Sequence, residues 1–264
     1  MASSDAGLFG PRSVAWQLHA DPSMIVGGMR ALLLQALNPR AMAGVADHSA
    51  FKDDPWGRFA RTAAFVATAT YGTTAEAEAI AARVRRVHLR VKGDDPVSGS
   101  PYSADDPDLL AWVHNVLAHS LLTAKHRYGG GLSRRDAERY LREMVRMAEL
   151  VGTPADLVPV TLPDLVDYLQ AAPLVASPAA QRAKWTVLTP PLSPRLRAAW
   201  LVADTAAIGL LPRKARALYG LWWFPPADPA VRVAMTVVDA ALRRVLPEPP
   251  ALRNARARLG LAAA

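Results

Sequence analysis

Hydrophobic and polar residues follow one another along most of this chain with the period of an α-helix. Apolar residues recur three or four positions apart, in segments that begin at capping residues and end at Gly or Pro. Asp54-Pro55 begins one such helix, which ends near Tyr71-Gly72, and Thr74 caps the next, from Ala75 to Val91. No segment of any length alternates with the period of a strand. The pattern therefore predicts an all-α fold.

The same signals divide the rest of the chain. Residues 1–12 are predicted to be a flexible leader, and residues 13–264 a single helical domain. Prolines become dense after Pro173, so residues 175–264 are expected to form a Pro-rich helical C-terminal lobe. A loop is expected from Asp94 to Tyr102. Further helices are expected over residues 13–18, 22–37, 40–51, 108–128, 134–151, 165–172, 178–188, 195–209, 213–221, 228–245 and 250–259.

Composition narrows the class of protein. Half of the residues (51%) are hydrophobic and 20% are charged, which is enough apolar material for a sizeable core. There is no cysteine, so thiolate ligands, iron–sulfur clusters and disulfides are excluded. No secretory signal opens the chain, and its apolar runs are too short to span a bilayer. We expect a cytoplasmic protein, with contact to a membrane surface left open.

The net charge is +8, carried by arginines scattered through the predicted helices. Such a charge is compatible with binding to nucleic acid or to anionic lipid. No basic run is interleaved with exposed-looking aromatics, however, and no helix-turn-helix punctuation is present. We therefore expect no nucleic-acid partner. The oligomeric state does not follow from the sequence.

Two histidines lie among apolar residues of predicted helices. His88 belongs to a stripe formed with Ile80, Val84, Val87 and Val91. A neutral imidazole in such a place can bind iron, provided that a partner orients its other nitrogen. The alternative is a core histidine that is hydrogen-bonded to a backbone carbonyl.

His114 is a competing candidate, because it shares a helix face with Leu110, Leu117 and Leu121. It could ligate iron, line a pocket or be an ordinary buried histidine. His119, further along the same predicted helix, is expected to lie on a more polar, solvated face.

Polar residues cluster on the predicted helix that precedes His88. Arg58 and Thr62 are four positions apart and share a face, and Arg61 leans the same way. A guanidinium matches the geometry of a carboxylate, so this patch could hold a haem propionate or dioxygen. The alternative is the solvated start of a helix. Gly27-Gly28, inside another predicted helix, indicates close approach of a second helix or of a flat ligand.

Other catalytic templates are missing from the sequence. There is no Glu-x-x-His pair for a di-iron bundle and no His-Glu-x-x-His. There is also no phosphate-binding Gly-x-x-x-x-Gly-Lys loop and no Gly-x-Ser-x-Gly elbow. The Gly129-Gly130-Gly131 run follows a helix and is interpreted as a cap.

Several segments, in order, resemble one known family. They are WQLHADPSMIVGGMRALLLQALNPRAMAGVADHSAF, DPWGRFARTAAFVATATYG, VRRVHLRVKG, YSADDPDLLAWVHNVLAHSLL and YLREMVRMAELVG. Together they resemble the MpaB-type oxygenases, whose relatives include latex-clearing rubber oxygenases and a fungal oxygenase bound to the endoplasmic reticulum. The resemblance covers roughly residues 13–175. It implies a globin-like helical core that binds haem b and uses dioxygen to cleave a carbon–carbon double bond.

The resemblance also implies roles for individual residues. His88 would be the proximal haem ligand, and Arg58 and Thr62 would lie near the haem. Arg61 occupies the position of a lysine that ligates iron in rubber oxygenases, and a guanidinium is a poor iron ligand because it stays protonated. The general-base glutamate of those enzymes has no counterpart that we can locate, and His48 is a candidate substitute. Gly28 would let its helix approach the macrocycle.

The candidates for an apolar lining of this pocket are Met24, Met29, Met42, Phe65 and Trp112.

Three functions follow from this reading. The first is a haem b-dependent oxygenase that uses dioxygen, or peroxide, on a hydrophobic, unsaturated small molecule such as an isoprenoid or lipid. The second is a non-catalytic haem-binding or gas-sensing protein. The third is a haem-free helical protein that binds a lipid or a membrane surface through its basic C-terminal lobe, where Trp222, Trp223 and Phe224 lie close in sequence to Arg213 and Lys214.

Overall fold

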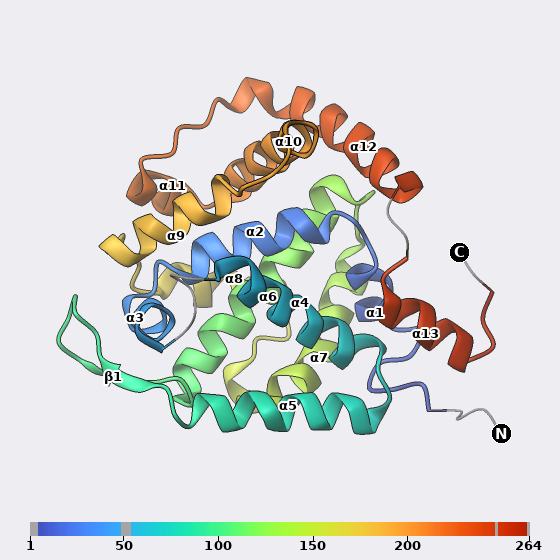
Figure 1. Cartoon of the computed structure of the whole chain (residues 1–264), viewed down its shortest axis with the longest axis horizontal. Helices are drawn as coiled ribbons and strands as arrows, with labels where there is room; N and C mark the ends of the chain where they lie inside the picture. Colours follow the sequence, from blue (N-terminus) through green and yellow to red (C-terminus); the bar gives the residue numbers. More distant parts are fainter. Residues whose placement is uncertain (1–4, 49–53, 246–247, 263–264) are drawn as a thin grey trace.

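The chain folds into helices with one small antiparallel hairpin, which confirms the all-α prediction (Figure 1). The computed structural model describes residues 5–48, 54–245 and 248–262. The elements are α1 Val14–His19, α2 Met24–Gln35, α3 Pro39–His48, α4 Pro55–Tyr71, α5 Thr74–His88, β1 Lys92–Asp94, β2 Pro101–Ser103, α6 Pro107–Tyr128, α7 Arg134–Leu150, α8 Leu162–Ala171, α9 Pro178–Leu188, α10 Pro194–Leu210, α11 Arg213–Tyr219, α12 Asp228–Val245 and α13 Pro250–Arg258. Two short 3₁₀ turns, Ala155–Leu157 and Pro225–Ala227, join them.

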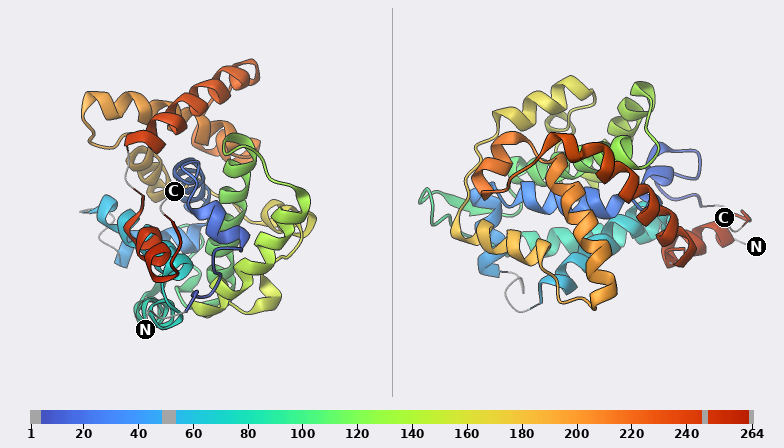
Figure 2. Two further views of the ribbon diagram at one scale, coloured as in Figure 1. Left: turned by 90° about the vertical axis from the view of Figure 1, so that its right-hand side faces the viewer. Right: turned by 90° about the horizontal axis from the view of Figure 1, so that it is seen from above.

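Helix α2 lies at the centre of the molecule. It packs against α6 on one side and against α9 and α10 on the other, so it separates the C-terminal lobe from the hairpin of α4 and α5 (Figures 1 and 2). Gly27 makes the contact with α6 possible: a Cβ there would lie 2.9 Å from Leu121 Cδ2 and 3.1 Å from the Ser120 carbonyl oxygen. The glycine is therefore explained by helix packing.

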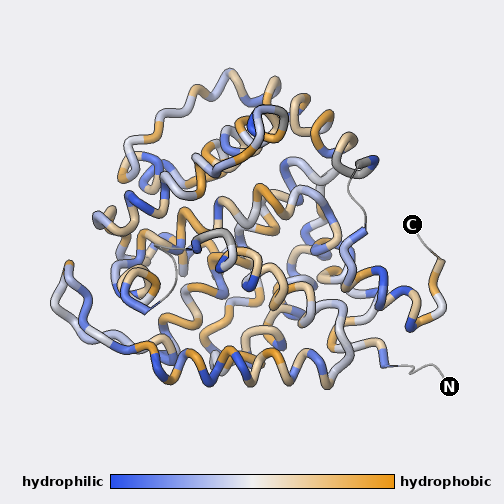
Figure 3. The backbone as a smooth tube through the Cα atoms, viewed as in Figure 1, coloured by the Kyte–Doolittle hydropathy of each residue, from blue (hydrophilic) through white to orange (hydrophobic). Residues whose placement is uncertain are grey.

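Most of the core surrounds this central helix. Leu33, Leu34 and Leu37 are fully buried within the largest apolar cluster, which continues into α6, α9 and α10. Figure 3 shows hydrophobic and hydrophilic residues following one another within single helices, as expected for helices with one buried face. None of the described helices is both long and apolar enough to span a bilayer.

The hairpin β1–β2 was not predicted. Helix α5 ends at His88 instead of Val91, and Gly93 pairs with Tyr102 across the hairpin. The Asp95 carboxylate accepts hydrogen bonds from the backbone N–H groups of Val97 and Ser98, which closes the turn. The expectation of a loop from Asp94 to Tyr102 is wrong at its two ends, which belong to β1 and β2, because strands of three residues are too short for an alternating pattern to be recognised.

Two terminal segments pack against the helical body. Within the predicted leader, Leu8 is buried and the Asp5 carboxylate accepts a hydrogen bond from the backbone N–H of Thr74. At the other end, α13 packs on α4, and Arg258 donates to the carbonyl oxygens of Tyr71 (2.8 Å) and Asp5 (3.0 Å). Asp5 and Arg258, from the first and last described segments, thus meet near the junction of α4 and α5.

Candidate functional site

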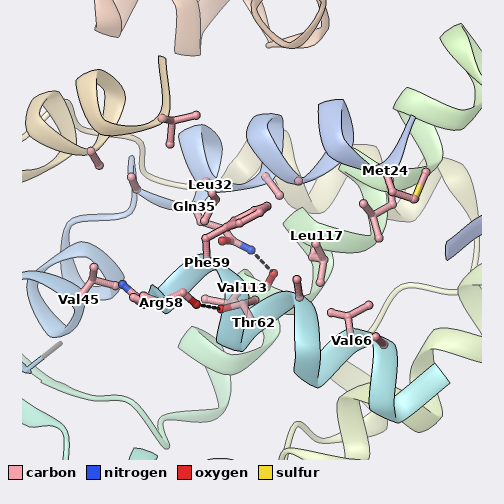
Figure 4. A pocket seen from close by; sticks show the side chains of 18 of the residues that line it. Met24, Leu32, Gln35, Val45, Arg58, Phe59, Thr62, Val66, Val113 and Leu117 are labelled. Atoms are coloured by element: carbon pink, nitrogen blue, oxygen red, sulfur yellow. Dashed lines mark hydrogen bonds between the residues drawn. The ribbon is translucent and has the colours of Figure 1, made fainter. Parts of the chain in front are cut away.

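A cavity of about 350 Å³ lies between α2, α4 and α6 and extends to α3 and α9 (Figure 4). Its size is within the range of small-molecule sites. Its walls are mostly aliphatic, with a few polar groups. The lining residues are His19, Met24, Gly28, Ala31, Leu32, Gln35, Ala36, Ala41, Met42, Val45, Arg58, Phe59, Thr62, Ala63, Val66, Ala67, Tyr71, Val113, Leu117, Leu121, Ala183, Thr186, Val187 and Pro249.

Helix α4 places two residues of the predicted polar patch, Arg58 and Thr62, in this cavity. The Asp54 carboxylate caps the helix by accepting from the backbone N–H of Gly57. Arg58, Thr62 and Val66 then follow at intervals of four and line the cavity on one face. Tyr71, thirteen residues beyond Arg58, also lines it, so the cavity follows α4 for about 20 Å.

The polar groups near the Arg58 end are partly engaged with the backbone. Thr62 donates its hydroxyl hydrogen to the carbonyl oxygen of Arg58 (3.1 Å), and Gln35 donates to the carbonyl oxygen of Val113 (2.8 Å; Figure 4). The Arg58 side chain points toward Val45 on α3 (Figure 4). These contacts tie α2 to α6 and fix the hydroxyl of Thr62 on α4.

The other end of the cavity is closed by a neutral histidine. The two ring nitrogens of His19 lie 2.7 Å from Thr70 Oγ1 and 3.0 Å from the hydroxyl of Tyr140. Burial lowers the pKa of His19 to about 4, so the ring is uncharged at neutral pH. His19 lines the cavity with both ring nitrogens engaged, whereas the sequence, where His19 precedes Asp21-Pro22, indicated only a contact at the entry to a helix.

Arg58 joins the cavity to His88 electrostatically. Burial lowers the pKa of Arg58, and the nearby charge of Arg61 lowers it further. The charge of Arg58 also lowers the pKa of His88, although the effects of burial and of Asp105 on that group are larger. Arg61 itself is exposed, forms an ion pair with Asp54 (3.3 Å) and is not among the lining residues.

His88 is the last residue of α5 and carries an unsatisfied ring nitrogen. Its Nδ1 is buried and has no hydrogen-bond partner among the described residues. Burial lowers the pKa of His88 below its ordinary value. The charge of Asp105 opposes this shift, and the charge of Arg58 adds to it with a smaller effect. The predicted stripe is wrong at Val87, which is exposed; the buried residues of α5 are Ala77 and Ala81.

Two histidines of α6 also have a buried ring nitrogen without a hydrogen-bond partner among the described residues. His114 is buried with Nε2 unpartnered, and burial lowers its pKa to about 4. His119 has a buried, unpartnered Nδ1 and a pKa of about 3, lowered by burial and by the charge of Arg30. The prediction that His119 is solvated is therefore wrong. Arg30 donates to the carbonyl oxygen of Leu210, which places this pair on the side of α10.

The remaining predicted site residues divide into two groups. Gly28 lines the cavity, with Phe59 at 3.7 Å from the position of a Cβ. His48 does not line it: the side chain is exposed and its Nε2 donates to the carbonyl oxygen of Lys92 (2.7 Å). Of the predicted apolar lining, Met24 and Met42 are present in the cavity wall. Met29, Phe65 and Trp112 pack in the core clusters instead.

A haem requires few ligands from the protein. The macrocycle brings four nitrogens, so one neutral imidazole with a free nitrogen is a sufficient protein ligand. Within the described ranges, no three His, Asp or Glu side chains gather as a metal site, but His88 and His114 each offer one such nitrogen. Arg58 has the charge that would pair with a propionate and the cavity walls are mostly aliphatic, but neither of these histidines is among the residues that line this cavity. The residues present are therefore compatible with haem in their chemical type.

Comparison with known proteins identifies a family. The family model described as "ER-bound oxygenase mpaB/B'/Rubber oxygenase, catalytic domain" matches residues 16–240, which is most of the chain. The match begins within α1 and ends within α12, so it includes every helix that lines the cavity. No curated protein and no solved structure matches the chain.

Proposed function

We propose, from the premise that this chain belongs to the mpaB/B'/rubber oxygenase family, that it is a haem b-dependent oxygenase. Its oxidant would be dioxygen, or peroxide, and its substrate a hydrophobic, unsaturated small molecule such as an isoprenoid or lipid. One observation carries the proposal: Arg58 and Thr62, both singled out by the family resemblance, line one largely aliphatic cavity.

His88 is the residue that we propose as the iron ligand. Its Nδ1 is buried and unpartnered, and its lowered pKa keeps the ring neutral, as a metal ligand must be. His114 meets the same chemical conditions and is the alternative ligand. Arg58, whose charge acts on His88, would pair with a propionate. When bound, haem supplies the activation of the oxidant.

The protein's own residues would orient the substrate and exclude water. Aliphatic side chains of α2, α4 and α6 bury a hydrocarbon chain, which removes water from the reacting region. Thr62 donates its hydroxyl hydrogen to the Arg58 carbonyl, so its oxygen would act toward a bound molecule only as an acceptor. Arg58 supplies a fixed positive charge at the same end. His48 as general base stays a prediction, and its ring would have to leave the Lys92 carbonyl to act.

The test is the visible spectrum of protein expressed with ample haem supply, before and after reduction with dithionite. We expect a Soret band that shifts on reduction, at about one haem per chain. His88→Ala should lose the band, whereas His114→Ala, the matched control from α6, should keep most of it. Arg58→Ala should keep haem but change the spectrum on ligand binding.

Three outcomes would contradict the proposal in part or in whole. Retention of haem by His88→Ala together with loss by His114→Ala would reverse the assignment of the ligand. A spectrum and activity unaltered by Arg58→Ala would remove that residue from the site. A wild-type protein that stays colourless on haem titration would refute haem dependence. Consumption of dioxygen with an unsaturated lipid then separates an oxygenase from a non-catalytic haem protein.

A further inference from the structure

Trp222 and Phe224 of the C-terminal lobe are exposed to solvent, whereas Trp223 between them packs against the protein. Residues 221–224 follow α11 without helical structure. Trp223 packs on α10 at Gly209, where a Cβ would lie 2.6 Å from the indole ring. On either side of it, Trp222 is 79% exposed and Phe224 is 50% exposed. The Trp222 and Phe224 rings stack, with centroids 5.7 Å apart and planes at 10°.

Helix α12, which follows this segment in the chain, also exposes apolar residues. Val233 (66% exposed) and Val237 (64% exposed) lie one turn apart on the same helix face. This helix crosses the outside of the C-terminal lobe, at the top of Figure 1, and faces the viewer in the right-hand view of Figure 2. Single exposed apolar residues are ordinary, but four large ones within sixteen residues of chain are not.

Basic residues are frequent in the same segment of the chain. Between residues 211 and 245 the chain has six cations and two acids, a net +4, which is half of the +8 of the whole chain. Arg213 and Lys214 are exposed. Of the two acids, Asp228 already forms ion pairs with Arg127 and Arg232. The cations are Arg213, Lys214, Arg216, Arg232, Arg243 and Arg244.

We propose that this C-terminal surface, formed by Trp222, Phe224, Val233 and Val237 with Arg213 and Lys214, docks on an anionic lipid bilayer. Tryptophan favours the boundary between headgroups and hydrocarbon. Lysine and arginine reach the headgroups while their aliphatic stems cover apolar surface. A second copy of this chain is a poorer partner, because it would bring the same +4 against itself. The inference does not depend on haem or on oxygenase activity.

Vesicle flotation with the full-length protein tests the proposal. The vesicles contain phosphatidylcholine alone or mixed with phosphatidylserine, and we expect binding to the mixed vesicles that weakens as salt is raised. The charge reversal Arg213→Glu/Lys214→Glu should lower partitioning at least about tenfold. The matched control is Arg134→Glu/Arg135→Glu on α7, two exposed arginines outside residues 211–245, with the same change in net charge. It should float like the wild type.

A second variant separates the aromatic contribution from the charge. Trp222→Ser/Phe224→Ser removes two solvent-exposed rings, so it should fold normally by circular dichroism and yet lose the binding that persists at high salt. Equal flotation of the two charge variants, or no loss in the aromatic variant, would overturn the proposal. So would a wild type that ignores vesicles but dimerises through these rings, because the surface would then bind a second copy.

Discussion

Gly27 and Gly28 form a natural pair for testing how α2 is packed. They are adjacent in one helix, but a Cβ on Gly27 would lie 2.9 Å from Leu121 Cδ2 and 3.1 Å from both Leu121 Cα and the Ser120 carbonyl oxygen. A Cβ on Gly28 would meet only Phe59, at 3.7 Å. Alanine at position 27 therefore presses against the backbone of α6, whereas at position 28 it enters the cavity in ordinary contact with Phe59.

The size of the effect follows from two opposing contributions. Gly→Ala inside a helix gains about 1 kcal/mol of helix propensity at either position. Overpacking against a helix that cannot shift costs about 1–3 kcal/mol, and it applies to Gly27→Ala alone. The propensity gain cancels between the two variants. Gly28→Ala should thus be more stable than Gly27→Ala by about 1–3 kcal/mol.

Urea unfolding followed by circular dichroism measures this difference directly. The variants should separate in urea midpoint at unchanged slope, and in melting temperature by about 2–4 °C per kcal/mol. Equal stability of the two variants would refute the packing argument, and would return Gly27 to the role of a ligand contact. Gly28→Ala should also lower the cavity volume, which binding of a small apolar probe would report.

Two buried carboxyl groups should give opposite pH dependences of stability. Burial raises the pKa of Asp21, but hydrogen bonds from Lys125 (2.7 Å) and Ser23 outweigh this effect, so the net pKa is lowered. Asp21→Asn should therefore lower the free energy of unfolding by about 3 kcal/mol at pH 7. In urea titrations at several pH values, this loss should shrink as the pH falls below about 4. An unchanged gap in acid would contradict the assignment. Burial raises the pKa of Asp204 to about 7, against the charge of Arg197, so its stabilising neutral form is lost as pH rises from about 4 through 7. Asp204→Asn should consequently gain about 1–3 kcal/mol at pH 8 and little at pH 4, and a loss at pH 8 would show that the carboxylate is needed there.

Much of the fold could be predicted because helix signals are local. Asp54-Pro55 marks the start of α4 as observed, and the cap of α5 is off by one residue, at Thr73, which forms a capping box with Glu76. Arg58 and Thr62 were grouped correctly on one face because side chains four apart meet on any helix. These features depend on a few neighbouring residues and need no knowledge of tertiary packing.

The parts that failed depend on contacts between distant segments. Val87 looks like a member of an apolar stripe, but its side chain is 54% exposed in the folded chain. Whether a methionine or an aromatic residue lines the cavity or packs in the core depends on how the neighbouring helices cross. Met24 lines the cavity, for example, and Met29 packs in the core. Whether a histidine nitrogen is left unpartnered, as in His88, His114 and His119, is decided by neighbours that no spacing rule identifies.

The C-terminal arm has a consequence for what the cavity can hold. Pro249 forms part of its wall, and α13 is fastened over the Tyr71 end of α4 by Arg258. Residues 248–262 lie outside the matched range 16–240, so the shared domain supplies the sides of the cavity and this tail contributes to its depth. A substitution in the tail can therefore change the shape of the cavity at Pro249 without altering Arg58 or Thr62. Within this chain, the wall at Pro249 and the polar groups of α4 come from separate segments of sequence.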